Sequence, residues 1–169
     1  MTRSEQPEFL SGLLDFLAAR RFFPEITSTG NQFEFSVVDR TNVEYFCTGR
    51  LTPADGALTS YEIRRDLCSY AGFPRMESLL HFLRFFGLIN QPFAILLHPN
   101  GQLVLSCAAI HQTKTFFDFE ALAYQFKFNA ACIASAMERL SSRDWSHEEI
   151  EGMVYLLSGV IKQEIPDAG

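Results

Sequence analysis

The spacing of apolar and polar residues changes several times along the chain. Recurrence every three to four residues predicts helices, and strict alternation predicts strands that bury one face. The helical pattern covers residues 7–21, 75–88, 118–141 and 146–164. The alternating pattern covers residues 33–38, 43–51 and 58–65, and a hairpin is predicted over 93–108. Helices and strands are therefore grouped rather than strictly alternating, which is typical of the α+β class.

Local sequence signals support several of these boundaries. Pro7 suits the first position of a helix, where a missing N–H is tolerated, and Asp118 suits a helix N-cap. Ser146 with Glu149 three residues later forms a capping box. The run His-Pro-Asn-Gly over 98–101 predicts a type I turn closed by a left-handed glycine, and hence a β-hairpin.

The predicted elements follow the order α-β-β-β-α-β-β-α, with one extra helix at the C-terminal end. This order indicates an antiparallel sheet packed by helices. The length of 169 residues and the absence of repeats, low-complexity tracts or a linker predict a single domain over residues 1–169.

Composition narrows the range of partners. The chain has 20 acidic and 14 basic residues, a formal charge of −6, which argues against binding to nucleic acid. Its apolar runs are too short to span a membrane and its N-terminus lacks the apolar core of a signal peptide, so the expected location is the cytoplasm. It has 17 phenylalanines and one tryptophan. That surplus of apolar side chains suggests a surface intended for another polypeptide.

Catalytic and metal-binding motifs are not visible in the sequence. There is no C-x-x-C pair, no H-E-x-x-H, no G-x-S-x-G and no phosphate-binding loop. The residues that would matter for such chemistry are isolated: Cys47, Cys68, Cys107, Cys132, His81, His98, His111 and His147. We therefore expect a protein that is not an enzyme and has no metal or cofactor. A dyad of Cys107 with His111 or His81, brought together by folding, is left open.

Two predicted helices carry more apolar surface than one sheet obviously requires. The helix over 75–88 is apolar nearly all round, so a second copy of the chain is one candidate for its outer cover. The helix over 7–21 has a wide apolar stripe, which together with the sheet suggests a peptide-binding surface. The alternative is that both helices simply fill the core.

The stretch from Ser78 to Leu140 resembles the class I chaperones of bacterial type III secretion, the Tir-chaperone-like family. It has a leucine-rich helix, a short strand followed by Pro-Asn-Gly, an apolar strand over Gln102–Cys107, a small loop, and a helix over Phe119–Leu140. The resemblance implies a cytoplasmic homodimer that holds the N-terminal region of secreted effector proteins before export.

The resemblance also implies site residues. It places the dimer interface on the second helix, at Leu79, Phe82, Leu83 and Phe86. It places the client-binding surface on the first helix and the sheet, at Phe9, Leu13, Phe16, Leu17, Phe33 and Phe35.

Two other functions fit the sequence. A regulatory protein-interaction domain similar to the YbjN family would have the same shape without a secreted client. A small-molecule enzyme would need histidine, cysteine and carboxylate side chains that converge in one pocket only after folding.

Overall fold

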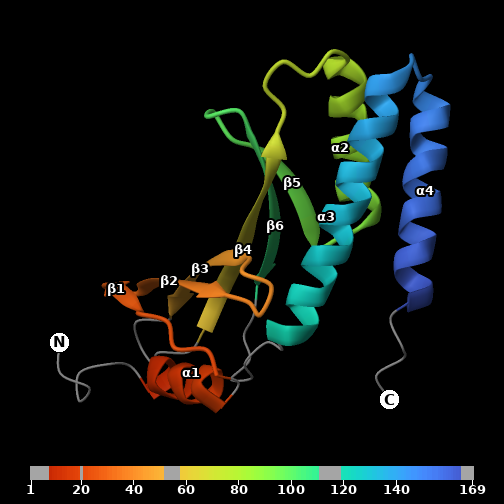
Figure 1. Ribbon diagram of the computed structural model, residues 1–169. Helices are drawn as coiled ribbons and strands as arrows, with labels where there is room; N and C mark the ends of the chain where they lie inside the picture. Colours follow the sequence, from red (N-terminus) through yellow and green to blue (C-terminus); the bar gives the residue numbers. More distant parts are fainter. Residues whose placement is uncertain (1–7, 20, 52–57, 111–118, 165–169) are drawn as a thin grey trace. The chain divides into compact units, whose positions relative to one another are not determined.

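The computed structural model describes residues 8–19, 21–51, 58–110 and 119–164 (Figure 1). Its helices are α1 (Glu8–Ala19), α2 (Met76–Ile89), α3 (Phe119–Ser142) and α4 (His147–Glu164). Its strands are β1 (Thr27–Thr29), β2 (Gln32–Val38), β3 (Glu44–Leu51), β4 (Leu58–Ser69), β5 (Phe93–Leu97) and β6 (Gln102–Ile110). These elements confirm the predicted α+β class.

The strands form one antiparallel sheet in the order β1-β2-β3-β4-β6-β5, so β1 and β5 are its two edges. Strand β1 was not predicted, because its three polar residues show no apolar alternation. Strand β4 continues to Ser69, four residues beyond the predicted end at Arg65.

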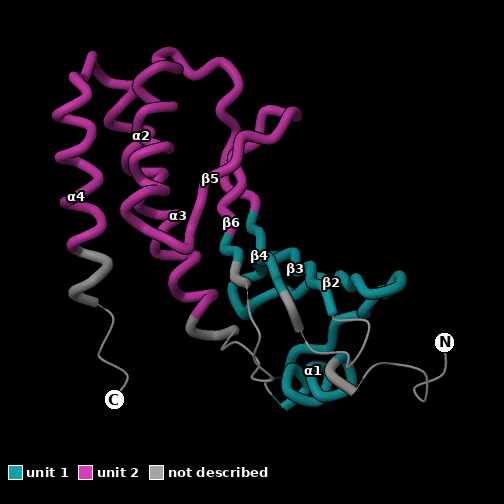
Figure 2. The backbone as a smooth tube through the Cα atoms, turned by 180° about the vertical axis from the view of Figure 1, so that it is seen from behind, with its two compact units in different colours: residues 1–65, 107–119 teal, residues 66–106, 120–169 magenta. Residues whose placement is uncertain are grey.

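The chain divides into two compact units (Figure 2). Unit 1 comprises residues 1–65 and 107–119, and unit 2 comprises residues 66–106 and 120–169. Two of the boundaries fall inside β4 and β6, and the third falls at the start of α3. Each unit is described separately below.

Unit 1 is built from α1 and the strands β1, β2 and β3 with the first part of β4. In β2 and β3 the buried and exposed residues alternate, as the sequence pattern predicted. The buried side chains share one face of the strands and meet the buried stripe of α1; they are Leu10, Leu13, Leu17, Phe33, Phe35, Val37, Tyr45, Cys47, Leu51 and Ile63. One face of this part of the sheet is thus covered.

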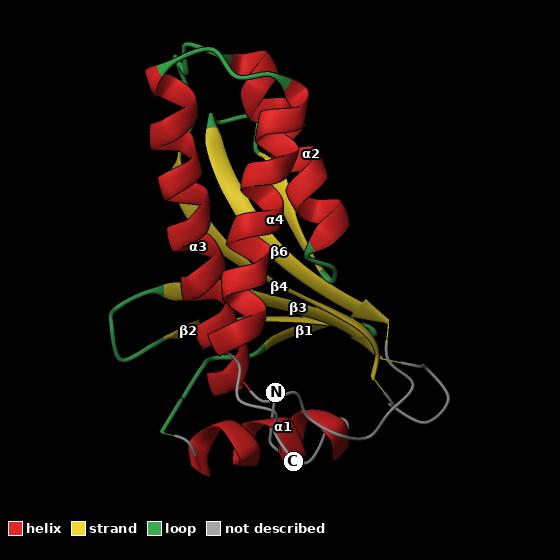
Figure 3. Cartoon of the chain, turned by 90° about the vertical axis from the view of Figure 1, so that its right-hand side faces the viewer, coloured by secondary structure: helices red, strands yellow, loops and turns green. Residues whose placement is uncertain are grey.

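Unit 2 has three layers. Helices α2 and α3 lie against β5 and β6, and α4 lies on the side of these helices that faces away from the strands (Figures 1 and 3). Phe93 of β5 meets Phe126 of α3 edge to face, with ring centroids 5.2 Å apart. The helical cores are apolar: Leu79, Phe82, Leu83, Phe86, Phe126, Ile133, Ala136, Leu140, Ile150, Met153 and Val154 are buried.

The predicted turn and cap signals are confirmed where the structure describes them. Gly101 has a φ of 86° and its N–H donates to the His98 carbonyl over 2.9 Å, which closes the β5–β6 hairpin. At α4 the Ser146 N–H donates to Glu149 Oε2 over 2.8 Å, and the Glu149 N–H donates to Ser146 Oγ over 3.2 Å. The signals at Pro7 and Asp118 lie outside the described residues.

Within the described ranges, no helix is both long enough and apolar enough to cross a membrane.

Candidate polypeptide-binding surfaces

Three of the four cysteines are buried, Cys47, Cys107 and Cys132, and Cys68 is partly buried. Cys47 and Cys107 are buried, and burial raises the pKa of their thiols to about 12 and about 11 respectively. Burial also raises the pKa of Cys68, whose sulfur lies 3.3 Å from Met137 Sδ. Nucleophilic cysteines need a lowered pKa and access to solvent. These three thiols stay protonated at neutral pH and are poor nucleophiles.

One histidine cluster in unit 2 has the elements of a polar site. His81 Nε2 of α2 lies 3.1 Å from Glu151 Oε1 of α4, and its ring stacks on His147 with centroids 4.0 Å apart. The adjoining cavity of about 200 Å³ is lined by His81, Arg84, Phe85, Leu88 and Glu151. Such a His–carboxylate pair supports nucleophilic catalysis only when a hydroxyl or thiol lies next to the imidazole. None of the residues lining this cavity carries a hydroxyl or a thiol.

Over the part of the chain that the structure describes, no group of three or more His, Cys, Asp or Glu side chains is placed to hold a metal ion.

The side chains predicted for a dimer interface point into unit 2. Leu79, Phe82 and Phe86 have no exposed surface and Leu83 is 5% exposed, since α2 is covered by the chain's own strands and helices. The apolar side chains of α2 that remain open to a partner are Leu80, 45% exposed, and Leu88, 60% exposed. In this structure the second cover predicted for α2 is supplied by α4, which contacts it directly.

The side chains predicted to bind a client are also largely internal. Leu13, Leu17, Phe33 and Phe35 are buried between α1 and the sheet. Phe16 is half-buried at the flank of the helix, and the side chain of Phe9 lies outside the described residues. The structure therefore brings four of the six together, but as the core of unit 1 and not as its surface.

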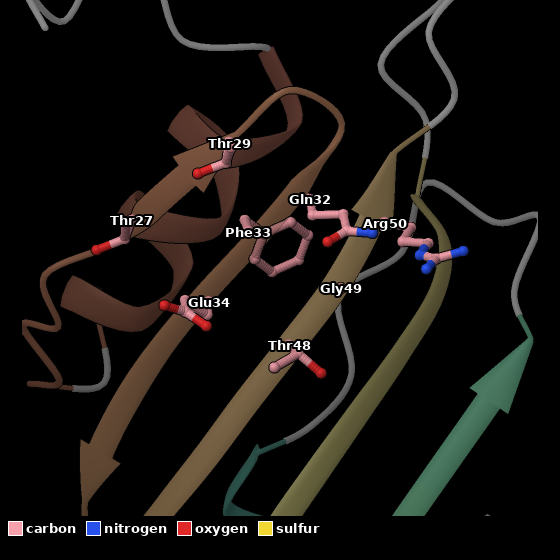
Figure 4. Close-up of a pocket in the computed structure, with 8 residues that line it drawn as sticks. All are labelled: Thr27, Thr29, Gln32, Phe33, Glu34, Thr48, Gly49 and Arg50. Atoms are coloured by element: carbon pink, nitrogen blue, oxygen red, sulfur yellow. The ribbon is translucent and has the colours of Figure 1, made fainter.

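Among the residues that the structure describes, no helix covers the opposite face of the unit 1 sheet, and this face is hollowed. Strand register places Thr27, Glu34, Thr48 and Glu62 in one row across β1–β4. The next row holds Thr29, Gln32, Arg50 and Ser60. Figure 4 shows the members of both rows that belong to β1, β2 and β3, on the side of the strands away from α1. Short hydroxyl side chains between longer charged ones leave a depression along the rows.

Two adjoining cavities make this depression a groove. The first, of about 320 Å³, lies over β1, β2 and β3, and the second, of about 380 Å³, lies over β3 and β4 with Ala108 of β6. They share Thr48, Gly49 and Arg50. Gly49 lies at the middle of the groove, and a side chain at this position would collide with the Phe33 ring on the covered face. We call this feature the sheet groove.

An apolar patch lies on the same open face, next to the sheet groove. Phe46 is 55% exposed and Val38 is 50% exposed. Phe46 pairs with Ser36 and Arg64 in the row that follows Glu34, Thr48 and Glu62, and Val38 pairs with Glu44 in the row after that. The open face thus offers hydrogen-bonding side chains and two apolar side chains in neighbouring rows.

Sequence reasoning did not select the residues of the open face. The alternation over residues 43–51 puts Phe46 on the opposite side of the strand from Val43, Tyr45 and Cys47. A large aromatic residue on the polar side of an alternating strand is the signal that could have identified it. The hydroxyl side chains of the groove carry no comparable signal, because threonine is common on exposed strand faces.

No family model matches the chain, and neither a curated protein nor a solved structure matches it.

Proposed function

We propose that the protein is a non-catalytic chaperone that binds the N-terminal region of secreted effector proteins before type III export. In this proposal it acts in the cytoplasm as a homodimer, without a cofactor, and has no nucleic-acid partner. The class and target of binding come from the resemblance of residues 78–140 to that chaperone family, together with the α+β element order.

The observation that carries the proposal is the open face of the unit 1 sheet. An extended polypeptide needs a shallow track several residues long, side chains that hydrogen-bond its backbone, and apolar contacts for alternate side chains. The sheet groove supplies Thr, Ser, Gln, Glu and Arg side chains along four strands. Phe46 and Val38 supply the apolar contacts.

Three other findings support a binding role over catalysis. The cysteine thiols with raised pKa values are poor nucleophiles, as argued above. Among the described residues that line the cavity beside His81, none carries a hydroxyl or a thiol. Large apolar side chains remain exposed in both units, for example Phe23 at 79% and Leu156 at 73%.

The first test is recovery of the tagged protein from its native cell, with bound proteins identified by mass spectrometry. The proposal expects one or a few stoichiometric secreted proteins, captured through their N-terminal regions. Recovery with only cytoplasmic regulatory proteins would contradict it and would favour the regulatory domain similar to the YbjN family.

The second test locates the surface. Phe46→Thr combined with Val38→Thr removes the apolar side chains and keeps a residue that favours strands. We expect the affinity for a captured N-terminal segment to fall roughly tenfold or more, because buried aromatic contacts dominate such interfaces. Leu156→Ala, at an exposed position in unit 2, is the matched control and should leave the affinity unchanged. Equal loss in both variants would move the client surface elsewhere.

A further inference from the structure

Strand β5 is one edge of the sheet. Its sequence is Phe-Ala-Ile-Leu-Leu, and among the described strands its neighbour is β6. Leu96 is 41% exposed, Leu97 is 38% exposed and Ile95 is half-buried. Edge strands are normally kept from pairing by charged side chains, prolines or bulges within the strand. β5 has no charge and no proline between Phe93 and Leu97, so its outer side is suited to receive another strand.

The hairpin defines which backbone groups point outward. The His98 N–H donates to the Gln102 carbonyl over 2.9 Å, so His98 directs its backbone groups toward β6. Direction alternates along an antiparallel strand, and Ile95 and Leu97 therefore direct their N–H and C=O groups away from β6. The Phe93 N–H is already used, because it donates to the Asn90 carbonyl over 2.9 Å. Two N–H donors and three carbonyl acceptors of β5 face outward.

We propose that the occupant of this edge is β5 of a second copy of the chain, paired antiparallel about a two-fold axis at Ile95. In this register Ile95 opposes Ile95 of the other copy, Ala94 opposes Leu96, and Phe93 opposes Leu97. It pairs all five residues and keeps each side chain on its own face of the joined sheet. This inference specifies the interface of the homodimer in the proposed function, and it does not depend on the identity of the client.

The outward backbone groups match this register. Each Ile95 N–H meets an Ile95 carbonyl, and each Leu97 N–H meets a Phe93 carbonyl. The Phe93 N–H, which is already bonded, needs no partner at the end of the paired segment. The arrangement leaves no outward N–H of β5 unpaired.

Side-chain chemistry favours a second copy over an unlike strand. Every cross-strand pair in the register is apolar. Although each copy carries a net charge of −6, no like charges therefore oppose each other between the two β5 strands. Ala94, the smallest side chain of β5, opposes the exposed Leu96 twice, which lets the two fit together. A two-fold contact uses the same edge on both copies and closes at two chains. The other edge, β1, is short and polar and offers no similar site for further growth.

The first experiment measures molar mass by light scattering across a concentration series. We expect twice the 19.2 kDa of the chain for the unmodified protein and 19.2 kDa for Leu96→Lys combined with Leu97→Lys. Leu156→Lys, at a more exposed position on α4, should remain a dimer. A wild-type protein that stays monomeric at all concentrations, or a double variant that stays dimeric, would overturn the proposal.

A second variant separates loss of pairing from loss of folding. Ile95→Pro removes an N–H that points away from β6, and proline is tolerated on an edge strand at such a position. We expect a folded monomer, checked by circular dichroism. Ala94→Pro is the contrasting variant, because it removes an N–H directed toward β6 and should unfold the hairpin.

A cysteine experiment tests the register itself. Ala94→Cys combined with Leu96→Cys places thiols opposite each other in a closely spaced pair, within the range of a disulfide. We expect mild oxidation to cross-link two copies of this double variant and neither single variant. Cross-linking of a single variant would show a different register. These experiments can exclude pairing of β5 with β5 while Phe46→Thr combined with Val38→Thr still weakens client binding. In that case the proposed function stands and only the dimer interface is wrong.

Discussion

The two edge strands of the sheet, one in each unit, differ in length and in composition. Edge strand β1 has three residues, Thr27–Thr29, all of which carry a hydroxyl group. Edge strand β5 has five residues, all apolar. A short polar edge gives an incoming strand few hydrogen bonds and no apolar contact, whereas a longer apolar edge gives both. The composition of β1 therefore disfavours strand pairing at that edge, whereas the composition of β5 favours it.

The difference continues behind each edge. In unit 1 a single helix covers one face of the strands, and the other face holds the open sheet groove. In unit 2 two layers of helices stand behind β5, and the core residues of α2 are buried. A well-supported edge is suited to strand pairing, because little ordering is needed when the partner arrives. An open sheet face is suited to a polypeptide lying across it.

The contrast between the two edges would lose its meaning if α2, and not β5, held two copies of the chain together. Phe86→Ala removes a fully buried ring, and we expect the free energy of unfolding to fall by about 3–5 kcal/mol. Leu88→Ala, at an exposed position two residues later, should cost less than about 0.5 kcal/mol. Urea unfolding of both variants measures the difference.

The opposite result has a clear meaning. If Phe86→Ala unfolds like Leu88→Ala but halves the molar mass, then the interface predicted from the sequence at Leu79, Phe82, Leu83 and Phe86 is correct. The helix would then turn that face to a partner in solution.

A second prediction tests how tightly the covered face of unit 1 is packed. A side chain at Gly49 would collide with the Phe33 ring, so Gly49→Ala should destabilise the protein by about 1–3 kcal/mol. Gly152→Ala in α4 is the matched control, since nothing lies within 4 Å of the added carbon. It should stabilise the protein by about 0.5–1 kcal/mol, because alanine favours the helix. Equal effects of the two changes in thermal unfolding would mean that Phe33 moves aside freely.

Features fixed by local chemistry could be predicted from the sequence. The glycine of the Pro-Asn-Gly turn and the Ser146–Glu149 capping box depend on residues within a few positions of each other, and both form as expected. The element order follows from the same local signals. Strand β1 could not be predicted in this way, because pairing with β2 and not its own pattern makes it a strand.

The candidate surfaces could be predicted much less well. The apolar spacing of α2 identified a helix that is covered on two sides, but it could not say that α4 provides the second cover. The same limit applies to α1, whose apolar stripe meets Phe33 and Phe35 in the core. A pattern shows that a side chain is apolar, and only the fold shows whether the chain itself covers it. Phe46 and β5 became visible as surfaces once neighbours in space were known.

A third prediction uses a titrating group in unit 1. The pKa of Tyr45 is raised from its ordinary value of 10.0 to about 12, first by burial and second by the Asp39 carboxylate. The Tyr45 hydroxyl donates to Asp39 Oδ2 over 3.2 Å. A raised pKa in the folded state gives a stability contribution that is complete below pH 10 and is lost as the pH rises toward 12.

Tyr45→Phe should lower stability by about 1 kcal/mol at neutral pH, through loss of this hydrogen bond. Between pH 10 and 12 the variant should lose less stability than the wild type. The urea midpoint of both proteins at several alkaline pH values measures this. Parallel curves for the two proteins would show that Tyr45 does not control the alkaline response of unit 1.

The smallest effect is expected in unit 2, at the opposite end of the pH scale. Hydrogen bonding to Arg143, and next to the Ser146 N–H, lowers the pKa of Glu149 from 4.5 to about 2. A lowered pKa in the folded state gives a contribution that is complete above about pH 4.5 and is lost as the pH falls toward 2. Glu149→Gln should remove this acid dependence at the start of α4. Trp145, the single tryptophan, lies beside this cap and stacks under Arg143 at 3.7 Å, so its fluorescence reports the change. If the acid transition of the Trp145 fluorescence is the same in both proteins, the Ser146–Glu149 capping box does not control the acid response at the start of α4.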